Sequence, residues 1–247
     1  MNKNPLIQNK LGLRKMGLNK AKGRMFQSVG WTWNPIAGCS HNCKYCWAES
    51  LSKRWGKTFE PQFREKYLKD KMPNDGSWIF VGSIGDTFCD AVPNAWIQKL
   101  FNFIENCEAD NKFLLMTKNP MRFCEWTGTL ERIRDKVILG TTIETNRNTK
   151  EFSDASHPLD RMIALRFMKQ SFNHTTFLSM EPISNFDLDK IKLWIQDIQP
   201  KAIEIGLENY TEYTDKPLNI AICELVTWIR ETNISLVLKD NLRWLEE

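Results

Sequence analysis

The sequence predicts an α/β fold, a complete or partial parallel (β/α) barrel of about six or seven βα units in residues 25–247. Short β-branched or aromatic runs alternate with longer stretches of helical periodicity, which is the pattern of βα repeats. No linker rich in Pro, Gly or Ser divides this region, so we expect one domain. This number of repeats suits a barrel better than an open doubly wound sheet, although both share the same local pattern.

The expected strands are short runs of apolar and β-branched residues. They span residues 25–33, 78–84, 113–117, 137–143, 176–180, 202–205 and 235–238. Helices are expected between them, near residues 43–55, 94–107, 129–134, 158–170, 187–197 and 218–231. The helix over 94–107 illustrates the reasoning, because Trp96, Leu100 and Ile104 fall on one helical face. Pro93 precedes its start, where proline is tolerated. Residues 56–77 read as an excursion between the first helix and the second strand.

Composition excludes several classes of protein. With 42% hydrophobic and 26% charged residues among 247, the chain has enough apolar residues for a sizeable core. Disorder, collagen-like repeats and coiled coil are therefore excluded. No apolar run approaches the roughly 18 residues of a membrane span, and no secretory signal begins the chain, so we expect a soluble, cytoplasmic protein. Seven cysteines do not suit a disulfide scaffold, so reduced thiols or metal ligation are expected.

Charge is divided unevenly along the chain. Residues 1–24 contain seven Lys or Arg and no acid, whereas the rest of the chain sums to −3. We expect residues 1–24 to form a flexible basic arm, whose charge suits screened attraction to the phosphates of nucleic acid. A solvated terminus without a partner is the alternative interpretation.

Three cysteines stand at CxxxCxxC spacing just after the first expected strand. Cys39, Cys43 and Cys46 lie in a loop that opens into a helix, and thiolates are natural ligands of iron–sulfur clusters and of zinc. A closed structural zinc site needs four ligands, and the other four cysteines are scattered along the chain. Three ligands on one loop leave a fourth metal position open. Zinc with His41 or an acid as fourth ligand is the alternative.

The triplet, with Tyr45 before its last cysteine and a strand before the loop, resembles the signature of the radical S-adenosylmethionine (AdoMet) superfamily. Further motifs resemble the phage Gp37/Gp68-like (DUF5131-type) family over residues 28–241. They are Trp33-Asn34-Pro35, Cys46-Trp47-Ala48-Glu49, Thr117-Lys118-Asn119-Pro120, Ser179-Met180-Glu181-Pro182 and Leu238-Lys239-Asp240. This chain has Trp47 where Tyr is commoner in that family, which keeps an aromatic ring and removes a hydroxyl.

The resemblance implies that Cys39, Cys43 and Cys46 hold a [4Fe–4S] cluster whose fourth iron binds AdoMet. It further implies that one electron, from a reductase or a flavodoxin- or ferredoxin-type donor, cleaves AdoMet. The 5′-deoxyadenosyl radical so formed then abstracts hydrogen from a substrate. The superfamily fold is a full or partial βα barrel, with its site at the carboxyl ends of the strands.

Strand ends supply the other candidate residues. Those expected to bind AdoMet beside Tyr45 are Ser83, Gly85, Asp86, Glu144, Asn146 and Glu181. Asp86 stands where the superfamily places an acid that binds the methionyl amine, and Gly85 would permit a close backbone approach. An ordinary Gly-Asp turn is the alternative. Glu144 and Asn146 are candidates for the ribose hydroxyls or the cosubstrate carboxylate.

Three acids at neighbouring strand ends would repel one another unless a cation or a hydrogen-bond donor lies between them. A sulfonium with an ammonium, as in AdoMet, would meet that condition. Lys118 and Lys239 end the third and seventh strands, where they are candidates to pair with these acids or to hold a substrate anion. A solvated strand terminus is the alternative for either lysine. Trp47 is a third candidate for substrate contact. Cys89 follows the second strand closely enough to be a candidate auxiliary thiol.

We therefore predict a radical AdoMet enzyme that acts on an unidentified substrate. The basic arm favours a substrate related to nucleic acid. The alternative from another class is a zinc-stabilised nucleic-acid-binding module without catalysis. An interaction protein that holds a cluster but has lost turnover is a third reading.

Overall fold

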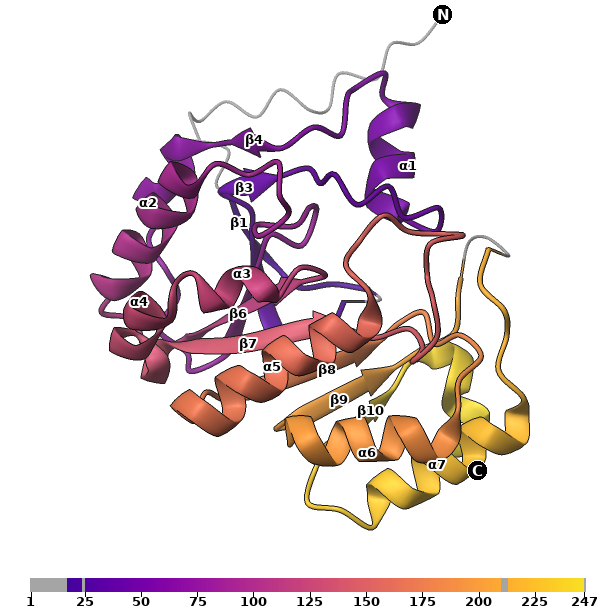
Figure 1. The fold of residues 1–247 in the computed structure, drawn as a ribbon. Helices are drawn as coiled ribbons and strands as arrows, with labels where there is room; N and C mark the ends of the chain where they lie inside the picture. The colour runs from indigo at the N-terminus through magenta and orange to yellow at the C-terminus, as the bar shows by residue number, and fades with distance from the viewer. Residues whose placement is uncertain (1–16, 24, 210–212, 247) are drawn as a thin grey trace, which may run out of the picture.

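The computed structural model describes residues 17–23, 25–209 and 213–246. Its centre is an eight-stranded sheet in the order β1-β2-β5-β6-β7-β8-β9-β10 (Figure 1). β1 (Leu18–Lys20) runs antiparallel to its neighbour β2, and all later neighbours pair in parallel. The parallel strands are β2 (Val29–Trp33), β5 (Trp78–Val81), β6 (Lys112–Thr117), β7 (Val137–Thr142), β8 (Thr176–Met180), β9 (Ala202–Ile205) and β10 (Ser235–Leu238).

This sheet is a curled half-barrel, because no pairing between described residues joins β1 to β10. The predicted partial parallel (β/α) barrel is therefore confirmed. Each of the seven parallel strands coincides with an expected one, and β8, β9 and β10 have the expected bounds. The first expected strand, residues 25–33, is shorter in the structure because residues 25–28 leave the sheet before β2 begins.

The outer helices lie between successive strands, as expected, and cover one face of the sheet (Figure 1). They are α2 (Asn94–Glu105), α5 (Pro158–Phe172), α6 (Leu188–Ile198) and α7 (Asn219–Arg230). In place of one helix at 129–134, the chain forms the short helices α3 (Met121–Cys124) and α4 (Thr127–Arg132). In the described part of the chain, 3₁₀ helices lie at Glu65–Lys69, Arg134–Lys136 and Asp240–Leu245. Among the described residues, no helix combines the length and the apolar character needed to cross a membrane.

Two small elements surround the cysteine loop. α1 (Trp47–Arg54) begins directly after Cys46, whose sulfur accepts a hydrogen bond from the backbone nitrogen of Glu49 and so caps the helix. β3 (Ile36–Ala37) pairs with β4 (Gln62–Phe63), so the excursion over residues 56–77 folds back on the start of the loop. The loop is thereby held from both ends.

Alternate strand residues face two separate cores, as the period of two in a strand requires. Phe113 and Leu115 of β6 lie in the large core that includes the helices, whereas Leu114 and Met116 lie in a smaller core on the inner face. Ala21, Met25 and Phe26 pack against the inner core. Phe26 stacks on Phe80 with ring centroids 5.3 Å apart.

Only part of the predicted basic arm, residues 1–24, lies within the described residues. Residues 1–16 and 24 lie outside the described residues, whereas Leu18–Lys20 form β1, a strand that the sequence did not predict. The fold therefore includes part of the arm.

A buried charge pair ties the segment 25–28 to the far edge of the half-barrel. Glu204 of β9 is fully buried, and its carboxylate accepts hydrogen bonds from the backbone nitrogens of Gln27 and Ser28, both at 3.2 Å. Lys239, at the end of β10, lies 3.1 Å from Glu204 and donates to the carbonyl of Met25 at 3.1 Å. These contacts join the segment before β2 to β9 and to the end of β10 without strand pairing.

Replacing Lys239 by Met should lower the free energy of unfolding by about 3 kcal/mol, because it leaves the Glu204 carboxylate buried without its cation. The measurement is urea denaturation followed by circular dichroism. Lys201→Met, at an exposed position just before β9, is the control and should change stability by less than about 0.5 kcal/mol. Equal losses in the two variants would contradict this account of Glu204.

Candidate active site at the carboxyl ends of the strands

A cavity of about 440 Å³ lies at the carboxyl ends of the parallel strands. This is the edge at which ligand sites of βα barrels are found. The predicted residues that line it are Cys39, Cys43, Tyr45, Cys46, Trp47, Ser83, Gly85, Asp86, Lys118 and Glu181. Glu144, Asn146 and Lys239 are not among its lining residues. The structure therefore brings together most of the side chains chosen from the sequence, including all three cysteines of the motif.

Two glycines set the position of the cysteine loop against the sheet. Gly38 donates from its nitrogen to the carbonyl of Ile84 at 3.1 Å, and its own carbonyl accepts from the nitrogen of Asp86 at 3.0 Å. A Cβ at Gly85 would lie only 2.3 Å from the Gly38 oxygen. The close approach expected at Gly85 is thus to the backbone of the cysteine loop.

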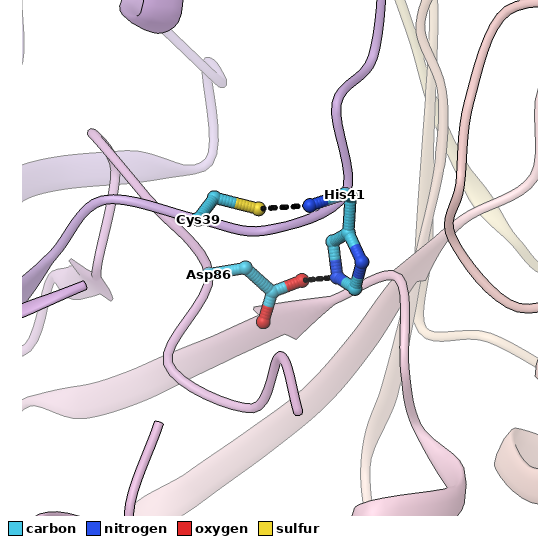
Figure 2. A group of neighbouring side chains, drawn as sticks. All are labelled: Cys39, His41 and Asp86. Carbon is cyan, nitrogen blue, oxygen red and sulfur yellow. Dashed lines mark hydrogen bonds and ion pairs between the residues drawn. The ribbon is translucent and has the colours of Figure 1, made fainter. Parts of the chain in front are cut away.

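The Asp86 carboxylate lies between the cysteine loop and the end of β6 (Figure 2). One oxygen accepts from His41 Nε2 at 2.9 Å, from the Thr117 hydroxyl at 3.0 Å and from the backbone nitrogen of Lys118 at 2.8 Å. The other oxygen accepts from the backbone nitrogen of Phe88 at 2.9 Å. Burial alone would raise the pKa of Asp86, but His41 and the backbone donors outweigh it and hold that pKa below its usual value.

Asp86 is therefore already surrounded by donors from the protein. The sequence predicted that it would bind the methionyl amine of AdoMet. In the structure its carboxylate connects His41 of the cysteine loop to Thr117 and Lys118 at the end of β6, and contact with the amine stays a prediction. This role of His41 was not predicted from the sequence, where His41 was considered only as an alternative zinc ligand.

Two cysteines of the motif accept a hydrogen bond from a backbone nitrogen, and the third meets two side chains. The sulfur of Cys39 accepts from the backbone nitrogen of His41 at 3.4 Å (Figure 2). The sulfur of Cys46 accepts from the nitrogen of Glu49 at 3.4 Å. The sulfur of Cys43 instead meets two side chains, the Ser153 hydroxyl at 3.1 Å and the Lys118 ammonium at 3.6 Å.

Without a metal, two of these thiols hold their protons. Burial raises the pKa of the Cys46 thiol. A hydrogen bond to Cys89, together with burial, raises the pKa of Cys39, and the same bond lowers the pKa of Cys89 to about 6. Metal binding at this loop must therefore release protons. Cys89, the candidate auxiliary thiol, is buried beside Cys39.

Glu144 is the centre of a buried ionic network beneath the cavity. Its carboxylate lies 2.6 Å from the Lys118 ammonium and 2.8 Å from Arg161, and it also accepts from the Tyr45 hydroxyl. Burial would raise the pKa of Glu144, but Arg161 and Lys118 outweigh it and lower that pKa to about 2. Burial likewise disfavours the charged form of Lys118, but Cys43 and Glu144 hold its pKa above the usual value.

The remaining acids and amides also have partners within the protein. Glu181 lies 3.4 Å from Lys239 and lines the cavity with a side chain 22% exposed. Asn146 bonds to Asp187, the residue that precedes α6, through both ends of its amide, at 3.0 and 2.8 Å. The repulsion expected among Asp86, Glu144 and Glu181 is therefore relieved by protein donors, and the predicted pairing of Lys118 and Lys239 with these acids is the arrangement found.

Sequence reasoning missed two contributors to the site, Ser153 and Arg161. Ser153 lies 110 residues beyond Cys43 in a loop that matches no motif. Arg161 is a fully buried residue of α5, and the only sequence signal was a basic residue on an otherwise apolar helix face. Neither contact could be predicted from the sequence, because the partners of Ser153 and Arg161 are distant along the chain.

The fold is that of the radical AdoMet enzymes. The structure is similar to spore photoproduct lyase complexed with dinucleoside spore photoproduct, with a TM-score of 0.57 and 14% identity over 90% of this chain and 66% of that chain. It is also similar to Streptococcus suis SuiB bound to S-adenosylmethionine, with a TM-score of 0.53 and 10% identity over 84% of this chain and 49% of that one. The chain thus spans 66% of the lyase and about half of SuiB.

Residues 26–199 match the family described as "Protein of unknown function (DUF5131)", and the chain belongs to that family. The resemblance predicted from the motifs is thereby confirmed for the superfamily fold and for this family. The phage Gp37/Gp68 name is not part of the family description and stays a prediction. No curated protein matches the sequence.

Lowering the pH from about 4.5 to about 2 should destabilise the protein, in part through Glu144. Its folded-state pKa of about 2 lies below the usual 4.5, so its stabilising contribution is complete above pH 4.5 and is lost as the pH falls toward 2. Glu144→Gln should flatten the pH dependence in this window and should reduce stability at neutral pH by about 3 kcal/mol, because Arg161 and Lys118 lose their partner.

The measurement is the free energy of unfolding in urea at several pH values. Glu151→Gln is the matched control, because Glu151 is an exposed glutamate of the loop before α5. A Glu144→Gln variant with the same pH dependence as the control would refute the assignment.

Proposed function

We propose that this protein is a radical AdoMet enzyme whose cluster is held by Cys39, Cys43 and Cys46. The observation that carries the proposal is that all three cysteines of one loop line the same cavity, at the edge of the sheet where sites of this fold lie. When bound, the cluster and AdoMet supply one-electron cleavage of the sulfonium, which yields methionine and a 5′-deoxyadenosyl radical.

The three cysteines fit a [4Fe–4S] cluster better than a single metal ion. A cluster spreads its thiolate ligands over separate irons, and all three sulfurs here have a hydrogen-bond donor, as cluster ligands usually do. The atoms that lie within 4.8 Å of one another are instead those of Cys39, His41 and Asp86. A single ion at that trio would displace the hydrogen bonds of Asp86 and leave Cys43 and Cys46 outside.

Among the three strand-end acids, we assign contact with AdoMet to Glu181. Its side chain is 22% exposed and lines the cavity, whereas the side chains of Asp86 and Glu144 are 8% and 0% exposed. Asp86 and Glu144 then position the loop and Lys118, and Tyr45 and Trp47 form an aromatic wall that excludes water. Ser83 and Gly85 line the same side. A reductase or a flavodoxin- or ferredoxin-type protein is the proposed electron donor.

A substrate related to nucleic acid is supported by the wall of the cavity and by the arm. Lys22, from the basic arm, lines the cavity together with Phe59 and Trp47, whose side chain is 46% exposed. Such rings stack on bases, and cations attract phosphates. One of the similar structures contains a dinucleoside spore photoproduct, which belongs to the same chemical class.

Alanine at Cys39, Cys43 or Cys46 should abolish AdoMet cleavage, because each variant leaves one iron without its thiolate. The protein is reconstituted anaerobically with iron and sulfide, reduced with dithionite and given AdoMet, and 5′-deoxyadenosine is measured by chromatography. Cys223→Ala, remote on α7, is the control and should retain the activity of the parent. Cleavage by any of the three loop variants at the parental rate would overturn the assignment.

Deleting residues 1–16 should weaken binding of a single-stranded oligonucleotide several-fold at low salt and should reduce its salt dependence, because four basic residues are removed. The cut leaves β1 and Lys22 in place, so iron loading should not change. The measurement is fluorescence anisotropy at several salt concentrations. Lys190→Gln with Lys192→Gln, on α6, tests for a general charge effect. An unchanged dissociation constant would remove the arm as a support for this substrate class.

The second candidate is the zinc-stabilised nucleic-acid-binding module, which the trio Cys39, His41 and Asp86 favours. It predicts a colourless protein whose fold depends on zinc, and His41→Ala would then release the metal. A radical AdoMet enzyme predicts that His41→Ala retains iron.

A further inference from the structure

The ammonium of Lys118 lies against one of the three cluster cysteines. Its nitrogen is 3.6 Å from the sulfur of Cys43, and the Lys118 side chain is only 15% exposed. The hydroxyl of Ser153 meets the same sulfur at 3.1 Å. A metal-bound thiolate has no proton to give, so Ser153 must then donate to Cys43, as Lys118 does.

This arrangement distinguishes Cys43 from the other two ligands. Cys39 accepts a hydrogen bond from the backbone nitrogen of His41 and is also hydrogen-bonded to the side chain of Cys89. Cys46 accepts from the backbone nitrogen of Glu49 in α1. Cys43 accepts from two side chains that come from distant segments, one of them a cation. The asymmetry is therefore built by tertiary packing and is open to test by substitution.

The network behind Lys118 leaves positive charge facing Cys43. Lys118 and Arg161 share the single carboxylate of Glu144, at 2.6 and 2.8 Å. Arg161 is fully buried, and its second terminal nitrogen has no hydrogen-bond partner among the described residues. One carboxylate balances only one of the two cations.

The position of Lys118 is fixed from several sides. Its backbone nitrogen donates to Asp86 at 2.8 Å, and its carbonyl accepts from the Ser156 hydroxyl at 2.7 Å. Its ammonium also contacts the hydroxyl of Tyr45 and lies 4.4 Å from the centre of that ring. Lys118 is thus held beside Cys43 before any cofactor binds.

We propose that Lys118 and Ser153 are positioning residues that raise the reduction potential of the cluster through Cys43. This inference rests on the proposed function. A cluster gains one negative charge on reduction, so a nearby cation and hydrogen bonds to a ligand sulfur favour the reduced form. The cluster is then reducible by a weaker electron donor than its thiolates alone would permit.

The test is a reductive titration of the reconstituted full-length protein, with the reduced cluster followed by electron paramagnetic resonance. Lys118→Met should make the midpoint potential more negative, and Ser153→Ala should shift it in the same direction by less, because it removes a neutral donor. Lys150→Met removes a cation from the exposed loop near Ser153 and is the matched control, with a midpoint like that of the parent. Iron content and circular dichroism establish that each variant is folded and loaded.

A loaded Lys118→Met protein with the parental midpoint would overturn the inference. If Lys118→Met does not fold, Ser153→Ala decides, since an unchanged midpoint there is equally contrary to it. If the parental protein cleaves AdoMet but the Lys118 and Ser153 variants have the parental midpoint potential, this inference alone is overturned. Parental protein that binds no iron would overturn the proposed function, and this inference with it.

Discussion

The carboxylate of Asp86 accepts hydrogen bonds from three parts of the chain, and the geometry of the cavity depends on it. His41 belongs to the cysteine loop, Phe88 to the loop after β5, and Thr117 and Lys118 to the end of β6. A buried carboxylate is costly unless donors replace its water, and these four contacts do so. Because His41 and Lys118 are both fixed by it, the same group places the cysteine loop and the cation beside Cys43.

The other buried carboxylates of the half-barrel likewise have cations or hydrogen-bond donors in place of water. Glu144 is buried with two cations and serves to hold Lys118, while Glu204 is buried with Lys239 and holds the segment that packs against the inner core. Among the three strand-end acids, Glu181 is the one that lines the cavity with an appreciably exposed side chain. Glu144 and Glu204 thus organise the framework, whereas Glu181 lines the cavity.

Much of the fold was predictable because each element carries a local pattern. Strands β8, β9 and β10 are short runs in which most residues are apolar, and the large helices have one apolar face, so neither pattern depends on distant partners. β1 was missed because Leu18–Lys20 is short, lies in a segment without acids, and pairs only at the sheet edge. The local composition favours a flexible arm, but pairing with β2 makes these residues a strand.

The site was predictable to the extent that it lies on strand ends and on one motif. The spacing of the cysteines and the rule for parallel strands gathered ten of the candidate residues around one cavity. The donors to Asp86, the partner of Asn146 and the contacts of Glu144 with Arg161 and Tyr45 were not predictable, since they depend on packing between residues as far apart as Tyr45 and Glu144. The position of an acid at a strand end identifies it as a candidate ligand-binding residue. That position does not show whether donors from the protein already bind its carboxylate.

The measurement that bears most directly on the cluster is metal analysis of protein purified without oxygen, combined with electron paramagnetic resonance before and after AdoMet is added. About four irons with matching sulfide, and a spectrum of the reduced cluster that changes with AdoMet, are expected if three cysteines leave one iron open. A colourless protein that contains zinc, or a cluster whose spectrum does not change when AdoMet is added, would contradict the proposed cluster with one open iron.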